Sequence, residues 1–240
     1  MGKSITKIIN EWLDPLLCVI YPNLCEVCGR TLVPGETVFC THCYLSMPRY
    51  NHFHDPFNEI HRRLFSSYSH MDHAGALYAY HRHDVYAKVI HKMKYGNRPD
   101  IGEKLGRIIA READAVGFFT GVDLLLPVPM HWWKELHRGY NQSKEIALGI
   151  KSVTGIPVGK NLKSGFKQDT QTKKNAKMRW KNTEGIYSVR HPEQLEGKHV
   201  MLIDDVITTG ATLLHCVEAL TQSVNDIKVS ACAIAATKLD

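Results

Sequence analysis

Two adjacent acids and a hydroxyl-rich turn form the part of the sequence best suited to chemistry. Asp204 and Asp205 directly follow the apolar run 200–203, so we expect them at the carboxyl end of a buried strand, where parallel sheets bind ligands. The turn 208–212 then supplies three threonine hydroxyls and Gly210 just before a predicted helix, and backbone N–H groups there can hold an anion. Acids that can accept hydrogen bonds from hydroxyls, next to a turn that can bind a phosphate, indicate a binding site for a ribose 5-phosphate. The alternative is a buried strand whose acids merely cap the next helix.

Four of the seven cysteines form two CxxC pairs. Cys25 and Cys28 are followed, after an eleven-residue spacer, by Cys40 and Cys43. Two such pairs complete the four-thiolate tetrahedron that a structural zinc ion prefers, and the spacer is long enough for a hairpin through 33–36. Because the protein fills all four positions, the ion would stabilise this module rather than perform chemistry. The alternative is a redox-active dithiol pair, which usually shows one CxxC at a helix N-terminus in a βαβ pattern.

A run of histidines raises the question of a second metal site. The eight side chains share no regular helical or strand spacing, which favours scattered surface and turn histidines over a common ion. They are His52, His54, His61, His70, His73, His81, His83 and His91.

Strand and helix patterns alternate along the rest of the chain. Strands separated by helices require crossover connections, which indicates a mainly parallel sheet with both faces covered. The predicted strands are 74–80, 123–126, 156–158, 198–203 and 227–236, and the predicted helices are 85–95, 102–119, 141–154 and 213–220. Between them, 161–185 has few large apolar residues and is expected to be a long mobile loop with a short helical piece.

Composition and charge bound the class of protein. With 240 residues, 44% hydrophobic and 22% charged, the chain is typical of globular proteins and not of disordered or fibrous ones. No apolar run approaches the roughly 20 residues that cross a bilayer, and polar residues interrupt what would be a signal-peptide core, so we expect a cytoplasmic protein without membrane insertion. Residues 131–190 carry 13 Lys and Arg against 4 Asp and Glu. This local excess indicates a polyanionic partner or phosphorylated ligand, or else a solvated basic surface.

The run 200–212 resembles the 5-phosphoribosyl-1-pyrophosphate (PRPP) motif of type I phosphoribosyltransferases at every position. The resemblance implies that Asp204 and Asp205 contact the ribose hydroxyls, that the turn 208–212 holds the 5-phosphate, and that Mg²⁺ accompanies the pyrophosphate. The implied PRPP-binding residues are Asp204, Asp205, Val206, Thr208, Thr209, Gly210, Ala211, Thr212, Val128, Pro129 and Arg138.

Further segments are similar to the ComF family of competence proteins. The matching segments are Leu126-Pro127-Val128-Pro129, Arg138-Gly139-Tyr140-Asn141-Gln142-Ser143, Lys92-Met93-Lys94-Tyr95-Gly96, the four-cysteine module, and Thr170-Gln171 followed by Arg179 and Asn182. Tyr140 replaces the usual phenylalanine, and Lys173-Lys174-Asn175 departs from the family pattern. The resemblance implies that 128–132 is a pyrophosphate loop and that 161–181 closes over the ligand.

The family resemblance also implies an architecture and a role. It predicts an α/β, type I phosphoribosyltransferase-like domain over 51–240, with a mainly parallel sheet and flanking helices. Residues 1–50 would add an N-terminal helix and a zinc-ribbon module. The implied role is the handling of imported single-stranded DNA during natural transformation, together with other competence proteins. The alternatives are an active phosphoribosyltransferase with an unknown base or amine acceptor, and a regulator that senses PRPP.

The basic segment is the predicted surface for single-stranded DNA. Its cations would neutralise phosphates, while Trp180, together with Trp132 and Trp133, would stack on bases. The alternative is that these lysines only clamp pyrophosphate. The predicted contacts are Lys163, Lys167, Lys173, Lys174, Lys177, Arg179, Trp180 and Lys181.

Overall fold

The computed structural model describes residues 22–55, 57–65, 71–165 and 186–237. It divides into two compact units, Met1–Met47 and Pro48–Asp240, which are described separately. Residues 48–50 lie in the larger unit, where Arg49 forms a β-bridge with Tyr78. The predicted N-terminal helix lies outside the described residues.

The smaller unit is built around two tight turns that carry the cysteines. Leu24 and Thr31 form an antiparallel bridge, and Gly29, at φ +73°, closes the turn between them by donating its N–H to the Cys25 carbonyl over 2.9 Å. The Glu36 N–H donates to the Val33 carbonyl over 3.0 Å, so the predicted turn at 33–36 is present. The short helix α2 (Thr41–Leu45) follows.

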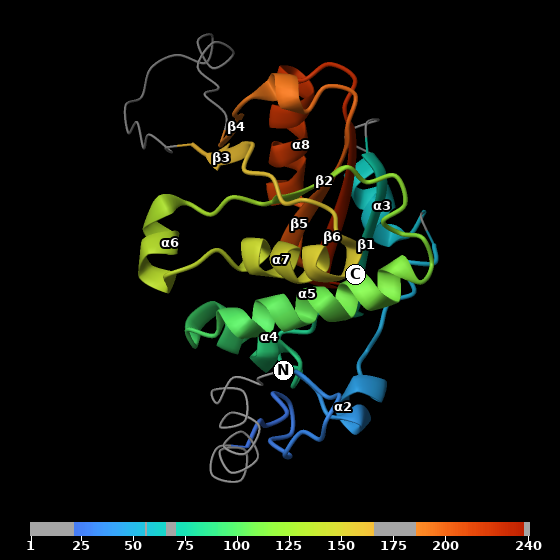
Figure 1. The fold of residues 1–240 in the computed structure, drawn as a ribbon, viewed down its shortest axis with the longest axis vertical. Coiled ribbons are helices and arrows are strands. Elements are labelled where there is room, and N and C mark those ends of the chain that lie inside the picture. The colour runs from blue at the N-terminus through green and yellow to red at the C-terminus, as the bar shows by residue number, and fades with distance from the viewer. Residues whose placement is uncertain (1–21, 56, 66–70, 166–185, 238–240) are drawn as a thin grey trace, which may run out of the picture. The chain divides into compact units, whose positions relative to one another are not determined.

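The larger unit contains a four-stranded parallel sheet (Figure 1). Its order is β1-β6-β5-β2, and Val158 extends it by a single parallel bridge to Leu125. A separate antiparallel pair, β3 and β4, precedes β5 in the chain. The strands are β1 (Met71–Ala79), β2 (Leu124–Pro127), β3 (Leu162–Ser164), β4 (Tyr187–Val189), β5 (His199–Ile207) and β6 (Lys228–Ala236).

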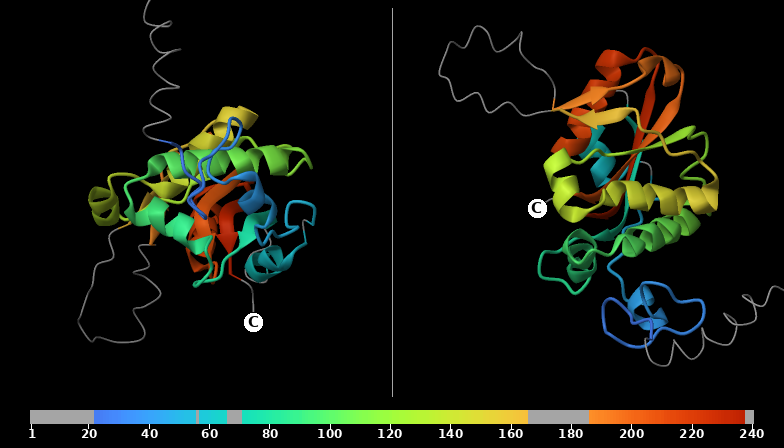
Figure 2. Two further views of the ribbon diagram at one scale, coloured as in Figure 1. Left: turned by 90° about the horizontal axis from the view of Figure 1, so that it is seen from below. Right: turned by 60° about the vertical axis from the view of Figure 1, so that its left-hand side comes forward.

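Helices cover the sheet in two layers, as Figures 1 and 2 show for α5 and α7 on one face. The other face carries the apolar core beneath α3 and α8, where alternate residues of β1, β5 and β6 meet Leu64 and Leu213. The helices are α3 (Glu59–Phe65), α4 (Ala87–Tyr95), α5 (Pro99–Asp114), α6 (Trp132–Arg138), α7 (Gln142–Thr154) and α8 (Ala211–Ser223), with a 3₁₀ turn at Pro192–Gln194.

Two glycines allow α5 and α7 to touch at the backbone. A Cβ on Gly106 would lie 2.1 Å from the Ile146 carbonyl oxygen, and one on Gly149 would lie 2.0 Å from that of Glu103. Both distances are far below van der Waals contact, so any side chain at these positions would push the helices apart. This contact fixes α7, whose N-terminal end carries residues of the candidate site.

The predicted α/β class, with a mainly parallel sheet and flanking helices, is confirmed, but several elements differ. The helix predicted for 102–119 spans Pro99–Asp114, because a turn with Gly117 at φ +75° follows it. The strand predicted for 198–203 continues to Ile207, since β6 remains beside it. Leu162–Ser164 is a strand where a loop was predicted, because it pairs with β4. The predicted strand 156–158 reduces to the single bridge at Val158.

Within the described residues, no helix is both long and apolar enough to span a bilayer.

Candidate functional site

Strand β5 carries both acids beyond the end of its neighbour β2. The last pair between these strands joins Pro127 to Ile203, whereas β5 remains paired with β6 as far as Ile207. Asp204 and Asp205 therefore lie at the carboxyl edge of the sheet, with the β2 side of the strand open. This is the position at which open parallel sheets bind ligands.

Asp204 is partly buried between β5 and α7. Its Oδ1 accepts hydrogen bonds from the Ser143 hydroxyl, at 3.3 Å, and from the Asp205 backbone N–H, at 2.8 Å. Burial, followed by the neighbouring charge of Asp205, raises the pKa of the Asp204 carboxyl to about 7. Burial thus disfavours the charged form of Asp204, and a ligand hydroxyl or a cation bound to the carboxylate would stabilise that form.

Asp205 pairs with a cation instead. Lys94, near the C-terminal end of α4, places its Nζ 2.9 Å from Asp205 Oδ2. The adjacent acids thus have different partners, a hydroxyl on α7 for Asp204 and an ammonium on α4 for Asp205. Lys94 also brings positive charge to the edge at which an anionic ligand would bind.

The turn after β5 is shaped by Gly210, the N-cap residue of α8. Gly210 adopts φ +81°, which favours glycine, and a Cβ there would lie 2.6 Å from Leu64 Cδ2, so the Leu64 side chain would have to shift to admit one. Gly210 makes no side-chain cap, the Ala211 N–H donates to the Thr209 hydroxyl oxygen over 3.3 Å, and the first turn contains no acid, so the positive end of this 13-residue helix could attract an anion. The Arg63 guanidinium, on α3, donates to the Thr208 carbonyl and, at 3.1 Å, to that of Thr237.

A third segment, after β2, is held against β5. The Val128 N–H donates to the Ile203 carbonyl over 2.9 Å, and the Asn141 side-chain amide donates to the Val128 carbonyl over 3.1 Å. The Asn141 side-chain oxygen also accepts from the Lys144 N–H, which caps α7. One side chain therefore fixes both the segment that begins at Val128 and the start of the helix that presents Ser143.

A cationic and aromatic cavity of about 470 Å³ lies beside Lys94. Arg138 lines it, with its guanidinium 5.0 Å from the centre of the Tyr95 ring and a 3.1 Å hydrogen bond to Gln142 Oε1. Its lining residues are Lys94, Tyr95, Asn97, Lys134, Leu136, His137, Arg138 and Gly139. This combination suits an anion joined to a planar ring.

The structure thus places the expected ligand-binding residues on three segments at the carboxyl edge. Val206 is partly exposed on β5, Pro129 is partly exposed after β2, and the hydroxyl-bearing residues Thr208, Thr209 and Thr212 are exposed. The partners Lys94 and Ser143 were not predicted as site residues. Both lie in segments that resemble the ComF family, which is the signal that could have drawn attention to them.

The predicted DNA surface is only partly described. Lys163 is exposed on β3, and Trp132 and Trp133 are each about half exposed on α6. The other predicted contacts, from Lys167 to Lys181, lie outside the described residues, as do Thr170-Gln171 and Asn182.

The four cysteines of the smaller unit converge. The Sγ atoms of Cys25, Cys28, Cys40 and Cys43 all lie within 4.8 Å of one another, with 3.7 Å between Cys28 and Cys40. Burial raises the pKa of the Cys25 thiol, but backbone hydrogen bonds, among them those from Cys28 and Cys40, outweigh it and bring that pKa to about 7. Backbone donors that stabilise a thiolate also favour metal ligation, so this cluster could bind zinc.

The interpretation of the histidines as scattered surface and turn residues is wrong for His61, which is buried on α3, whereas His52 lies in the turn 52–54 but is not at the surface. His52 and His61 are buried, at 5% and 6% exposure. The ring of His52 stacks on Tyr50, with ring centres 3.9 Å apart. Burial lowers the pKa of His52 to about 4, so its ring is neutral near neutral pH. A third histidine, His73, lies close to His199 in the fold.

Comparison with curated proteins gives two kinds of relative. "DNA utilization protein YhgH" of Escherichia coli K12 is 25% identical over 208 residues, which covers 82% of this chain and 84% of that protein. "Competence protein F" of Haemophilus influenzae is 29% identical over 130 residues, or 52% of this chain and 57% of that protein. The match to the Salmonella typhi YhgH protein spans 59% of its length. The resemblance to the ComF family is thus confirmed by homologues that include a competence protein F. No family model matches the chain.

Comparison with solved structures finds enzymes of phosphoribosyl chemistry at low similarity. The glutamine PRPP amidotransferase from Bacillus subtilis has a TM-score of 0.39 and 22% identity, covering 54% of this chain and 25% of that one. A purine phosphoribosyltransferase from Pyrococcus horikoshii has a TM-score of 0.33 and 14% identity, covering 56% of this chain and 82% of that one.

Proposed function

We propose that this chain is a ComF-type protein that binds PRPP at the carboxyl edge of its sheet and acts on imported single-stranded DNA. One observation carries the PRPP assignment. Two acids extend past the end of β2, and the N-terminus of α8, whose first turn contains no acid, follows them at a turn where Gly210 adopts a positive φ. The first feature suits ribose hydroxyls and the second suits a phosphate. The names of the homologues support the DNA role.

Each part of the ligand has a matching part of the site. Asp204 and Asp205 would accept hydrogen bonds from the two ribose hydroxyls, and the turn 208–212 would hold the 5-phosphate through backbone N–H groups. The pyrophosphate would lie near Val128, on the side where Lys94 and Arg138 supply positive charge. Mg²⁺ bound with the pyrophosphate would neutralise further charge on it.

Calorimetric titration with PRPP and Mg²⁺ tests this assignment. We expect the double variant Asp204→Asn/Asp205→Asn to lose most of its PRPP affinity, because an amide cannot replace a carboxylate that accepts from hydroxyls and neutralises a nearby cation. The matched control is Asp226→Asn, at an exposed loop position where φ is +51°, a conformation that asparagine tolerates. Unchanged affinity in the double variant would contradict the ribose role.

A second candidate function is phosphoribosyl transfer from PRPP to a base or amine. The cavity beside Lys94 and Tyr95 favours it, because a planar acceptor could occupy the aromatic wall next to the ribose site. Release of pyrophosphate upon addition of an acceptor base would assign an enzyme. PRPP binding without release, with bases or with DNA, would favour the DNA-handling or sensing role.

We also propose that the four cysteines hold one structural zinc ion. All four ligand positions come from the chain, so the ion would stabilise the smaller unit. Elemental analysis of protein purified without chelator should find zinc, and each Cys→Ser change should remove one ion per chain. The absence of zinc from the wild-type protein would contradict the proposal.

The DNA surface is proposed from charge and aromatic exposure. Binding that rests on phosphate neutralisation should weaken steeply with salt and show little sequence preference. Fluorescence anisotropy with a labelled single strand should therefore give a salt slope that shrinks when Lys173, Lys174 and Lys177 are changed together. No binding at low salt would contradict the proposal for this chain acting alone.

A further inference from the structure

The opposite edge of the sheet, where the strands begin, carries a second cluster of polar side chains. Asp72 and His73 lie near the start of β1, and His199 is the first residue of β5. One carboxylate oxygen and one ring nitrogen from each histidine all lie within 4.8 Å of one another. Strand β6 runs between β1 and β5 and contributes Ser230 to the same place.

A β-bulge brings two consecutive residues to this cluster. Met71 pairs with Val229 and Ala74 with Ala231, so that on β1 two residues, Asp72 and His73, oppose the single residue Ser230 of β6. In a regular strand, neighbouring side chains point to opposite faces. Here His73 Nδ1 lies 2.8 Å from Asp72 Oδ2, so the side chains of two consecutive residues are in contact at the bulge.

The hydrogen bonds of His73 leave a place for a cation. Its Nε2 lies 2.9 Å from the Phe118 carbonyl oxygen, which can only accept, so Nε2 carries a proton. In the neutral ring, Nδ1 is then a lone pair directed at the Asp72 carboxylate. A second proton on the ring, or a metal cation shared by His73 Nδ1 and Asp72 Oδ2, removes this conflict between two acceptors.

The second histidine is oriented in a similar way. His199 Nε2 lies 2.8 Å from Ser230 Oγ, which also lies 3.1 Å from His73 Nδ1. The His199 ring makes a further hydrogen bond to the backbone of Gly121, in the same loop as Phe118. Metal-binding histidines commonly have their remaining nitrogen held by a backbone carbonyl or carboxylate, which fixes the ring orientation.

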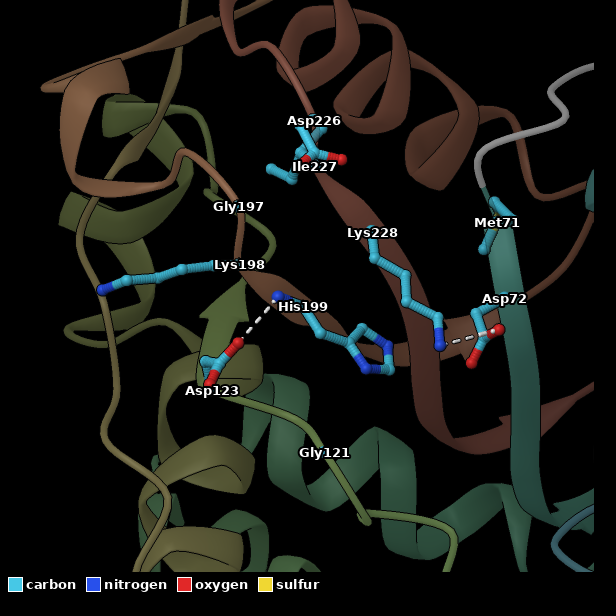
Figure 3. A pocket seen from close by; sticks show the side chains of 10 residues that line it. All are labelled: Met71, Asp72, Gly121, Asp123, Gly197, Lys198, His199, Asp226, Ile227 and Lys228. Atoms are coloured by element: carbon cyan, nitrogen blue, oxygen red, sulfur yellow. Dashed lines mark hydrogen bonds and ion pairs between the residues drawn. The ribbon is translucent and has the colours of Figure 1, made fainter.

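Solvent reaches this cluster. A cavity of about 510 Å³ opens at the amino edge of the sheet, and Figure 3 shows His199 and Asp72 among the side chains that line it. Lys228 Nζ lies 3.1 Å from Asp72 Oδ1, and the Lys228 side chain is about half exposed, so it can move aside. An ion therefore has a path through the cavity to Asp72 and His199, next to which His73 lies.

We propose that Asp72, His73 and His199 form a binding site for a divalent transition-metal ion, with zinc as the probe. Imidazole nitrogen and carboxylate oxygen are common zinc ligands, at about 2.0–2.2 Å from the ion. Ligand atoms in such a site lie about 3–4 Å apart, so rotation of these side chains from their present spacing closes the site. This site shares no residue with the cysteine cluster, and it lies at the edge of the sheet opposite to the carboxyl edge.

The test compares zinc binding by the full-length chain and its variants, starting from protein whose zinc content has been measured by elemental analysis. In calorimetric titration with zinc, the wild-type chain should bind one more equivalent than Asp72→Asn or His73→Gln. The controls are Asp226→Asn, which lines the same cavity, and the exposed His54→Gln. Both controls should bind as many equivalents as the wild type.

Cobalt supplies a second readout that separates this site from the cysteines. Cobalt bound to nitrogen and oxygen should give weak visible bands without the sulfur-to-metal charge-transfer absorption of a thiolate site, and Asp72→Asn should lose them. If His73→Gln fails to fold, Asp72→Asn decides the question, because the Asp72 side chain is 36% exposed. Equal zinc equivalents in the wild type and Asp72→Asn, with unchanged cobalt bands, would overturn the proposal.

Discussion

Replacing Asp204 with asparagine should make the protein more stable, although it removes a residue proposed to bind the ligand. Burial and the charge of Asp205 raise the pKa of Asp204 to about 7, from an ordinary value of about 3.9. The folded state therefore holds the proton more tightly than the unfolded state does. The stability that this proton provides is complete below about pH 4 and is lost as the pH rises through 7.

The size of the effect follows from the pKa difference. About three pH units, at about 1.36 kcal/mol each, set an upper limit of about 4 kcal/mol at pH 8. Because the carboxyl is only partly buried, we expect about 2 kcal/mol. Asparagine keeps an oxygen that can accept from the Ser143 hydroxyl and the Asp205 N–H, but it carries no charge. For a unit of this size, the Tm of Asp204→Asn should exceed that of the wild type by about 4–8 °C at pH 8.

Thermal unfolding followed by circular dichroism at pH 8 and pH 5 measures the effect. The Tm advantage of Asp204→Asn should shrink by more than half at pH 5, where the folded wild-type protein already holds Asp204 protonated. The exposed control Asp226→Asn should change the Tm little at either pH. A variant that is less stable than the wild type at both pH values would refute the reasoning, because it would show that Asp204 stabilises the fold as a charged group.

Three further changes test other parts of the structure. Gly210→Ala should lower the free energy of unfolding by about 1–3 kcal/mol in urea denaturation and weaken PRPP binding, because a φ of +81° is strained for alanine and the Leu64 side chain would have to shift. Gly149→Ala should lower it by about 1–3 kcal/mol, since the new methyl group would lie 2.0 Å from a backbone oxygen of α5, and an unchanged denaturation midpoint would contradict the packing described. Cys40→Ser should release zinc and make the smaller unit sensitive to protease while the sheet survives, whereas loss of the sheet by circular dichroism would show that the two units fold together.

The parts of the fold that were predicted are those with strong local patterns. The helix over 141–154 has an apolar stripe and the capping residue Asn141, and the structure begins it at Gln142. The sequence order of apolar strand, paired acids and hydroxyl-glycine turn also predicted the β5–α8 connection, apart from the extension of β5 to Ile207. The periodic spacing of apolar residues and the position of capping and turn residues are properties of residues close together in the chain. A single sequence is therefore enough to predict the elements that depend on them.

The parts that were missed depend on contacts between distant segments. Helix α6 has seven residues and buries none of them, so it has no apolar stripe to detect. The strand β3 exists because it pairs with β4, on the far side of a long connection. The same holds for the partners in the sites. The ion pair of Lys94 with Asp205, and the approach of His73 to His199, are set by strand order and by a bulge, which spacing does not encode.

The central claim is that the carboxyl edge of this sheet binds PRPP, and a crystal structure of the protein with PRPP and Mg²⁺ tests it most directly. We expect the 5-phosphate within hydrogen-bond distance of the backbone N–H groups of 210–212, and the ribose hydroxyls within hydrogen-bond distance of Asp204 and Asp205. PRPP bound elsewhere, or the same crystals without PRPP at this edge under saturating ligand, would contradict it.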